Sequence, residues 1–257
     1  MNQETIDKML YFGPGFIPGE VWTSFFAMII LAILALIIFF VFRKLDATKP
    51  DKNHFVMIVE TLVDKVESFT VDLMGERYRW FSGYALGLMG YMIICFILSL
   101  IGFPAPFSYL GSTLCIALVT FIMIHATAVK VNKWRYFQRY LDPIPIFLPI
   151  NLISMWAPLL SLAFRLLGNV LAGFTLMSIV YYFLGELSDL IFGGIIGNGA
   201  ASIILPPFVT PVLHAYFDVF SGAIQTMIFT MLSMLFIAQE DPDEEVENIE
   251  QANSLKA

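Results

Sequence analysis

The sequence predicts an all-α membrane protein that crosses the bilayer about five times and adds one amphipathic helix at the membrane surface. Of its 257 residues, 58% are hydrophobic and only 14% are charged, whereas a soluble domain is nearer half apolar and a quarter charged. The mean hydropathy of +0.79 agrees. The apolar residues form runs of about 20 or more, the length that crosses hydrocarbon. We therefore expect a single membrane domain over residues 1–257.

The first span is expected at residues 21–42, VWTSFFAMIILAILALIIFFVF. This run is longer than the core of a signal peptide and no A-x-A-like site closes it, so we expect a retained helix. Arg43 and Lys44 follow and anchor that end on the cytoplasmic side. Residues 53–74 then alternate apolar and charged side chains at helical spacing. This pattern predicts an amphipathic helix on the membrane surface or against a partner.

Residues 81–128 predict a hairpin of two further spans, joined by the turn-rich stretch GFPAPFSYLG. The turn carries no charge, which suits a short non-cytoplasmic connection, and four basic residues between 130 and 139 mark the return to the cytoplasm. Cys95 and Cys115 each fall within an apolar span. We expect them to be small buried hydrophobes rather than a disulfide.

Two long apolar segments follow, at residues 146–184 and 203–238, separated by the Gly-rich stretch FGGIIGNGAAS. A helix of nearly forty residues at ~1.5 Å per residue would be roughly 58 Å long, about twice the ~30 Å hydrocarbon core. Pro158 alone would kink such a helix rather than turn it back. We therefore expect two long tilted helices instead of additional short spans.

An odd number of passages places the N-terminus outside and the acidic tail, residues 239–257, in the cytoplasm of a cell-membrane protein. Every basic cluster then lies on the cytoplasmic side, as the positive-inside rule requires. The net charge of −7 reflects the acidic tail. The basic segments 43–79 and 130–139 are explained by the positive-inside rule, so they do not indicate binding of nucleic acid.

Each long segment carries one polar stripe at spacings of three and four residues, so each stripe lies on one helical face. We expect these two faces to pack near one another. The first stripe is Asn151, Ser154, Pro158, Ser161, Arg165 and Asn169, and the second is His214, Asp218, Ser221, Gly222 and Gln225.

Arg165 and Asp218 are the most informative of these residues, because either charge costs roughly 2.5–3.5 kcal/mol at the bilayer centre. They line an ion path or form a static salt bridge with each other, and both interpretations stay open at this point. For His214 an interfacial role competes with a functional one, while residues such as Ser154 are ordinarily contacts between helices.

The sequence contains no phosphate-binding loop, no dinucleotide fingerprint and no metal-binding cluster. We therefore expect no cofactor and no metal ion, and hydrolytic or redox catalysis by this chain alone is improbable.

The stretches PINLI (149–153), SLAFRLLGNVLAG (161–173) and DVFSGAIQTMIFTML (218–232) closely resemble subunit a of F-type ATP synthases. The resemblance implies that Arg165 is the stator arginine facing the ring of c subunits, with Gln225 as its neighbour on the last helix. It further implies that Asn169 and Asp218, with His214 near the outer end, line the half-channel open to the outside. Ser161 would belong to the cytoplasmic side.

As a member of that family, the chain would provide two offset half-channels for protons, with Arg165 separating them and coupling ion flow to ring rotation. The two long helices would form the wall that faces the ring. The implied partners are the c-subunit ring, the b subunits of the peripheral stalk, the remainder of the ATP synthase and the lipid bilayer. Three positions depart from the family pattern: Asp218 stands where Glu or His is commoner, Phe174 where some members carry Glu, and Ser99 where Asn is common.

Two other functions compete with this one. A proton-coupled secondary transporter would also place Arg and Asp near the midplane, but such proteins usually show internal repeats, and none is visible here. A purely structural membrane subunit would need neither ionisable stripe.

Overall fold

The computed structural model describes residues 18–43, 54–133, 148–197 and 201–241. Within these ranges every regular element is a helix, which confirms the all-α prediction. The acidic tail beyond Asp241 and the basic residues Arg135 and Arg139 lie outside the described residues. In chain order the elements are α2 (Gly19–Arg43), α3 (His54–Met74), η1 (Glu76–Phe81), α4 (Ser82–Ile101), η2 (Pro106–Ser108), α5 (Leu110–Asn132), α7 (Leu148–Ile196), η4 (Ala201–Ile203), α8 (Pro206–His214), η5 (Ala215–Phe220) and α9 (Ser221–Ala238).

Five helical stretches of the described chain are long and apolar enough to cross a membrane. This finding agrees with the predicted multi-pass architecture and identifies an integral membrane protein. The stretches are Gly19–Arg43, Glu76–Ile101, Leu110–Asn132, Ile153–Gly194 and Ala201–Ala238.

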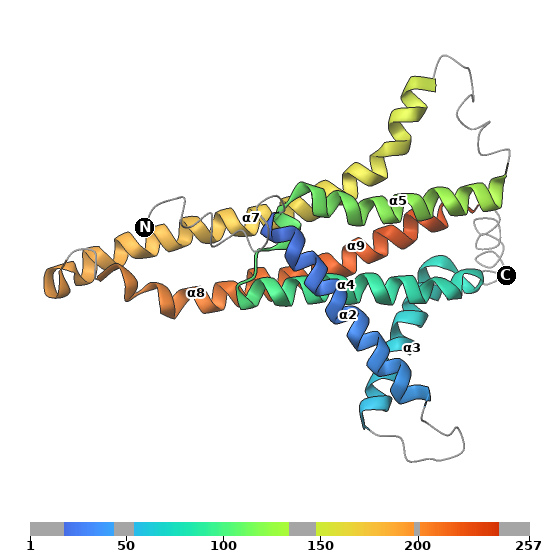
Figure 1. Ribbon diagram of the computed structural model, residues 1–257. Helices are drawn as coiled ribbons and strands as arrows, with labels where there is room; N and C mark the ends of the chain where they lie inside the picture. Colours follow the sequence, from blue (N-terminus) through green and yellow to red (C-terminus); the bar gives the residue numbers. More distant parts are fainter. Residues whose placement is uncertain (1–17, 44–53, 134–147, 198–200, 242–257) are drawn as a thin grey trace, which may run out of the picture.

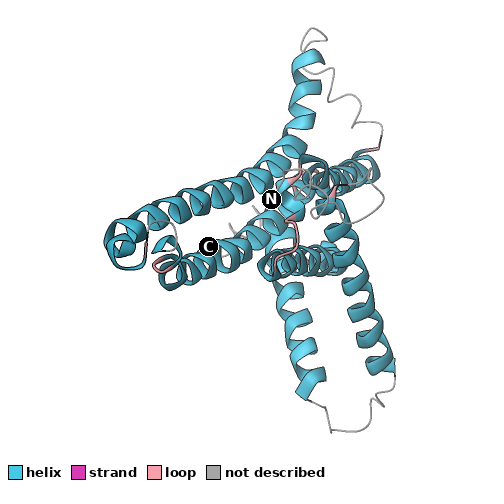
Figure 2. Ribbon diagram, turned by 60° about the vertical axis from the view of Figure 1, so that its left-hand side comes forward, coloured by secondary structure: helices cyan, strands magenta, loops and turns pink. Residues whose placement is uncertain are grey.

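Helix α7 is a single helix of 49 residues and lies antiparallel to the continuous path of α8, η5 and α9 (Figures 1 and 2). Its first turns diverge from α5 and point away from the bundle (Figure 1). Pro158 lies inside this part of the helix. A proline removes one backbone hydrogen bond and crowds the preceding turn, so it accounts for the change of direction.

The helix also continues past the predicted end at residue 184, into the Gly-rich stretch that was expected to be a loop. Gly193 and Gly194 keep helical backbone geometry, and the helix ends only at Gly197, whose φ is 98°. Polar contacts hold this end: the Ser188 hydroxyl donates to the Ala201 carbonyl and accepts from the Leu205 backbone N–H at 3.2 Å.

The main core lies where α4, α5, α7 and α9 meet. It is apolar and contains Met92, Cys95, Phe107, Ala117, Leu162, Ala163, Leu166 and Phe229. A chain of hydroxyl groups joins three of these helices, with Tyr84 Oη 2.8 Å from Thr120 Oγ1 and Thr120 Oγ1 3.3 Å from Ser233 Oγ. Such bonds satisfy polar groups that lipid cannot.

A second cluster fixes the amphipathic helix α3 to the bundle. Its C-terminal half packs through Val66, Phe69 and Met74 against η1, α4 and α9. The apolar side chains of its N-terminal half, among them Ile58 and Leu62, stay exposed. The helix is therefore partly an internal packing element, with an uncovered apolar face at its beginning.

Polar contacts close the bundle at the end of α9. The buried Asp241 carboxylate lies 3.0 Å from Arg77 Nη1 and accepts a 2.5 Å hydrogen bond from Tyr78. Asn132, at the end of α5, donates to the Glu240 carbonyl at 2.8 Å. The start of α4 and the ends of α5 and α9 thus share one end of the molecule, which also carries Lys130 and Lys133.

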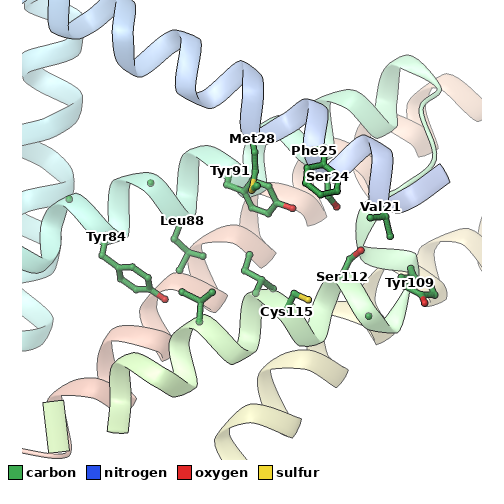
Figure 3. A pocket seen from close by; sticks show the side chains of 15 residues that line it. Val21, Ser24, Phe25, Met28, Tyr84, Leu88, Tyr91, Tyr109, Ser112 and Cys115 are labelled. Atoms are coloured by element: carbon green, nitrogen blue, oxygen red, sulfur yellow. The ribbon is translucent and has the colours of Figure 1, made fainter. Parts of the chain in front are cut away.

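Helix α2 crosses α4 obliquely and leaves most of its surface uncovered (Figure 1). Between α2, α4 and α5 lies a largely apolar cavity of about 640 Å³, lined by side chains such as Met28, Tyr91 and Cys115 (Figure 3). Both cysteines are free, as predicted, but Cys115 is exposed rather than buried because it faces this cavity. The cavity is lined without any residue of α7.

Candidate functional site

Arg165 lies on the uncovered face of α7. Its neighbours Leu162, Ala163 and Leu166 are buried in the main core, whereas Arg165 itself is exposed. Within the described part of the chain it has no carboxylate partner. A guanidinium that is charged at all ordinary pH values is thus presented outward from a membrane-spanning helix.

Asp218 pairs with His214, one helical turn earlier on the same helix. Its Oδ2 lies 2.6 Å from His214 Nδ1. The other ring nitrogen of His214, Nε2, lies 2.9 Å from the Tyr181 hydroxyl on α7. The static Arg165–Asp218 salt bridge considered above is absent from the described residues, and the partner of the carboxylate is a histidine.

The helix that carries these residues has an irregular turn between them. Residues Ala215–Phe220 form a π-helix, and the Ser221 N–H bonds to the Tyr216 carbonyl five residues back. Pro206, Pro207 and Pro211 precede this turn, and a proline inside a helix removes a backbone hydrogen bond. Turns of this kind occur frequently at functional sites, and this one begins directly after His214 and contains Asp218.

The two polar stripes also contact each other closer to Arg165. The Ser221 hydroxyl, at the start of α9, donates to Asn169 Oδ1 on α7 at 3.2 Å. Together with the Tyr181–His214 bond, this contact joins the two long helices at two points. Asn169 lies one turn from Arg165 on the same helix.

Three cavities follow this line of polar contacts. The outer vestibule, of about 740 Å³, is lined by Tyr181, Glu186, Asp189 and residues of η4 and α8. The central cavity, of about 290 Å³, is lined by Tyr181, His214 and Asp218. The inner cavity, of about 220 Å³, shares Asn169, Gly173 and Phe217 with the central cavity. The hydrogen-bonded groups and the residues that neighbouring cavities share form a line, here called the polar path, from the far end of α7 to Asn169, one turn from Arg165.

All three positions that depart from the family pattern line the central cavity. Ser99, Phe174 and Asp218 each contribute to its wall. Phe174 is also 70% exposed, so a bulky apolar ring stands where a carboxylate occurs in some relatives by the resemblance above. In this chain His214 supplies the imidazole and Asp218 the carboxylate of that cavity.

Ser161 and Gln225 are placed differently from these residues. Ser161 is exposed one turn before Arg165, on the same face of α7. Gln225 is buried, with 5% exposed, and its Nε2 finds no hydrogen-bond partner among the described residues. We expected Gln225 to lie next to Arg165, but no hydrogen bond joins the two side chains in the described chain.

Sequence reasoning missed Tyr181, Glu186 and Asp189. A signal for Tyr181 was present, since Asn169, Gly173, Met177 and Tyr181 recur every four residues and thus lie along one side of the helix. The two acids follow residue 184, where the helix was expected to end, so they were not projected onto it.

Comparison with known proteins identifies the family of this chain. The model of the family described as ATP synthase A chain matches residues 24–238. ATP synthase subunit a of Mycoplasma genitalium is 32% identical over 228 residues, which cover 82% of this chain and 77% of that relative. The subunit a of Mycoplasmoides gallisepticum is 31% identical over 236 residues, covering 86% of this chain and 77% of the relative. That of Nitrosospira multiformis is 21% identical over 241 residues, covering 92% and 86%. The chain belongs to the ATP synthase subunit a family, the proton-translocating stator subunits of the membrane sector of ATP synthase.

Proposed function

We propose that this chain carries protons between the two sides of the membrane and the carboxylates of a c-subunit ring, with Arg165 as the fixed charge that separates two offset half-channels. The observation that carries the proposal is the exposure of Arg165 without an anionic partner in the described chain. A buried or membrane-embedded cation needs a counter-charge. A carboxylate on a neighbouring ring would supply one.

The outward face of α7 suits a moving partner. Beyond Arg165 it carries small residues, Gly168 and Ala172, and both are exposed. Small residues let another helix approach closely. A ring helix passing this face would bring its carboxylate beside the guanidinium, which favours the ionised form of that acid.

The cavities supply the outer half-channel. They run from the outer vestibule to Asn169, and the His214–Asp218 pair lies on the way. A proton delivered along this path neutralises a ring carboxylate, which can then leave the arginine and enter the lipid. Because Arg165 cannot release its own proton, a proton cannot continue straight across, and Ser161 on the other side of Arg165 would belong to the cytoplasmic half-channel.

The orientation follows from charge. Lys130 and Lys133 lie at the end of the bundle closed by Asp241, and basic residues flank spans on the cytoplasmic side. The outer vestibule then opens on the opposite side. This supports an orientation with the N-terminus outside and the C-terminal tail in the cytoplasm, where the b subunits of the stalk would meet the chain.

The test is ATP-driven acidification of inverted membrane vesicles, comparing wild type with Arg165→Ala. Arg77→Lys, which keeps a charge at the bundle end, serves as the control for assembly. We expect Arg165→Ala to abolish acidification while membrane-bound ATP hydrolysis persists. Undiminished acidification by a correctly assembled Arg165→Ala complex would show that the arginine has no coupling role.

A further inference from the structure

Tyr181 occupies the boundary between two of the cavities. Among the described residues it is the one that lines both the outer vestibule and the central cavity. Its hydroxyl lies 2.9 Å from His214 Nε2, and the two ring centroids are 5.9 Å apart. The vestibule and the cavity that contains Asp218 therefore adjoin at this side chain.

The hydrogen bonds define a direction. A carboxylate oxygen only accepts hydrogen bonds, so the 2.6 Å contact with Asp218 Oδ2 places a hydrogen on His214 Nδ1. Neutral imidazole then has a bare Nε2, which accepts from the Tyr181 hydroxyl. The three groups form one chain in which Tyr181 donates to His214 and His214 donates to Asp218. A partner on one ring nitrogen fixes the tautomer and the orientation of a histidine.

We infer that Tyr181 is the relay residue at the mouth of the outer half-channel, passing protons from vestibule water to His214 and holding the imidazole in the tautomer that serves Asp218. This inference rests on the proposed function and assigns a role to a residue outside the two polar stripes.

The transfer balances atom by atom. The Tyr181 oxygen takes a proton from a hydronium ion in the vestibule, which leaves as water, and gives its own proton to Nε2. Nδ1 then gives its proton to Asp218 Oδ2. Each O–H or N–H bond that breaks is replaced by a new one, and Tyr181 ends as a neutral hydroxyl. Once Asp218 has passed its proton inward, the starting tautomer returns when a water molecule takes the proton from Nε2 and another proton is returned to Nδ1.

The position of the acids supports the direction of flow. Glu186 and Asp189 line the vestibule on the far side of Tyr181. Negative charge at the mouth of a low-dielectric path raises the local concentration of cations, hydronium included. The vestibule thus gathers protons, and Tyr181 is the first group of the hydrogen-bonded chain that they meet.

The experiment compares Tyr181→Phe with Tyr109→Phe in the whole complex. Both tyrosines are 43% exposed, but Tyr109 lines the cavity between α2, α4 and α5, away from the polar path. We measure passive proton conductance of vesicles stripped of the soluble sector. Tyr181→Phe should reduce conductance roughly three- to tenfold, the range expected for loss of one hydrogen bond, and Tyr109→Phe should leave it at the wild-type level.

Two further variants separate a relay from a merely structural role. Tyr181→His, which keeps a polar ring atom able to carry a proton, should restore most of the conductance lost in Tyr181→Phe. In a His214→Ala background, Tyr181→Phe should cause no additional loss, because coupled residues are not additive. Wild-type conductance in Tyr181→Phe, or equal losses in Tyr181→Phe and Tyr181→His, would overturn the inference.

An Arg165→Ala arm shows which claim has failed. If Arg165→Ala abolishes ATP-driven pumping and Tyr181→Phe is indistinguishable from wild type, the relay role is wrong and the proposed function stands. If Arg165→Ala pumps normally, the proposed function itself is wrong.

Discussion

Asp218 is bound by His214 at 2.6 Å and makes no ion pair with Arg165 in the described chain. Asp218 and Arg165, which the sequence predicted on facing helices, therefore do not neutralise each other in the described chain. The carboxylate belongs to a hydrogen-bonded chain with His214 and Tyr181, and under the proposed function the guanidinium meets a carboxylate of the c-subunit ring. A static salt bridge would have neutralised both and removed the reason to keep either in a membrane.

Replacing the carboxylate of Asp218 should stop proton flow without disturbing assembly. Asp218→Asn keeps the size of the side chain and an oxygen that accepts from His214 Nδ1, but an amide cannot take up and release a proton. Since positioned acid–base groups contribute about 10²-fold or more to proton-transfer rates, we expect passive conductance and ATP-driven pumping to fall at least tenfold. Asp72→Asn, on the exposed side of α3, is the matched control and should conduct normally.

Gly173 lies where the central and inner cavities join, and it lines both. A Cβ at this position would meet no atom within 4 Å, so the helix tolerates a side chain there. Gly173→Leu should therefore fill the junction and reduce proton conductance severalfold while the subunit still assembles. Gly194→Leu tests the reasoning, because Gly194 is equally open, lies on the same helix and lines none of the three cavities. Equal conductance in the two variants would contradict the path described here.

The Asp241 contacts should contribute measurably to stability. Asp241 is buried and bound by Arg77 and Tyr78. Its replacement by Ala leaves the Tyr78 hydroxyl without this partner, which costs about 1–3 kcal/mol of unfolding free energy for a buried group. Glu67→Ala breaks only the exposed pair with Arg79 and should cost less than about 1 kcal/mol. Thermal unfolding of the purified subunit in detergent measures both, and a larger loss for Glu67→Ala would reverse this ranking.

The sequence predicted the architecture well because membrane spans are specified by composition and length. Runs of apolar residues around Phe26, Cys95 and Ile122 form the expected helices, and Pro158 kinks a long helix rather than ending it. The prediction ended α7 at residue 184 because polarity rises there, but backbone geometry continues the helix until Gly197.

The site could be predicted only in part. Helical spacing identified Arg165, Asn169 and Asp218 as members of two polar faces. It placed His214 one turn before Asp218 on the same face, but it could not decide between His214 and Arg165 as the partner of the carboxylate, because that choice depends on how the two helices pack. Nor could it identify Tyr181, whose role depends on a contact between residues 33 positions apart in the chain.

The separation of the two half-channels by Arg165 is tested most directly by measuring passive and ATP-driven proton flux in the same vesicle preparations of Arg165→Ala. Without the fixed charge, a ring carboxylate can exchange protons with both half-channels at one position. We therefore predict that passive conductance persists while ATP-driven acidification is lost. Retention of ATP-driven acidification, or loss of both fluxes in a fully assembled complex, would contradict the claim that Arg165 separates the two paths.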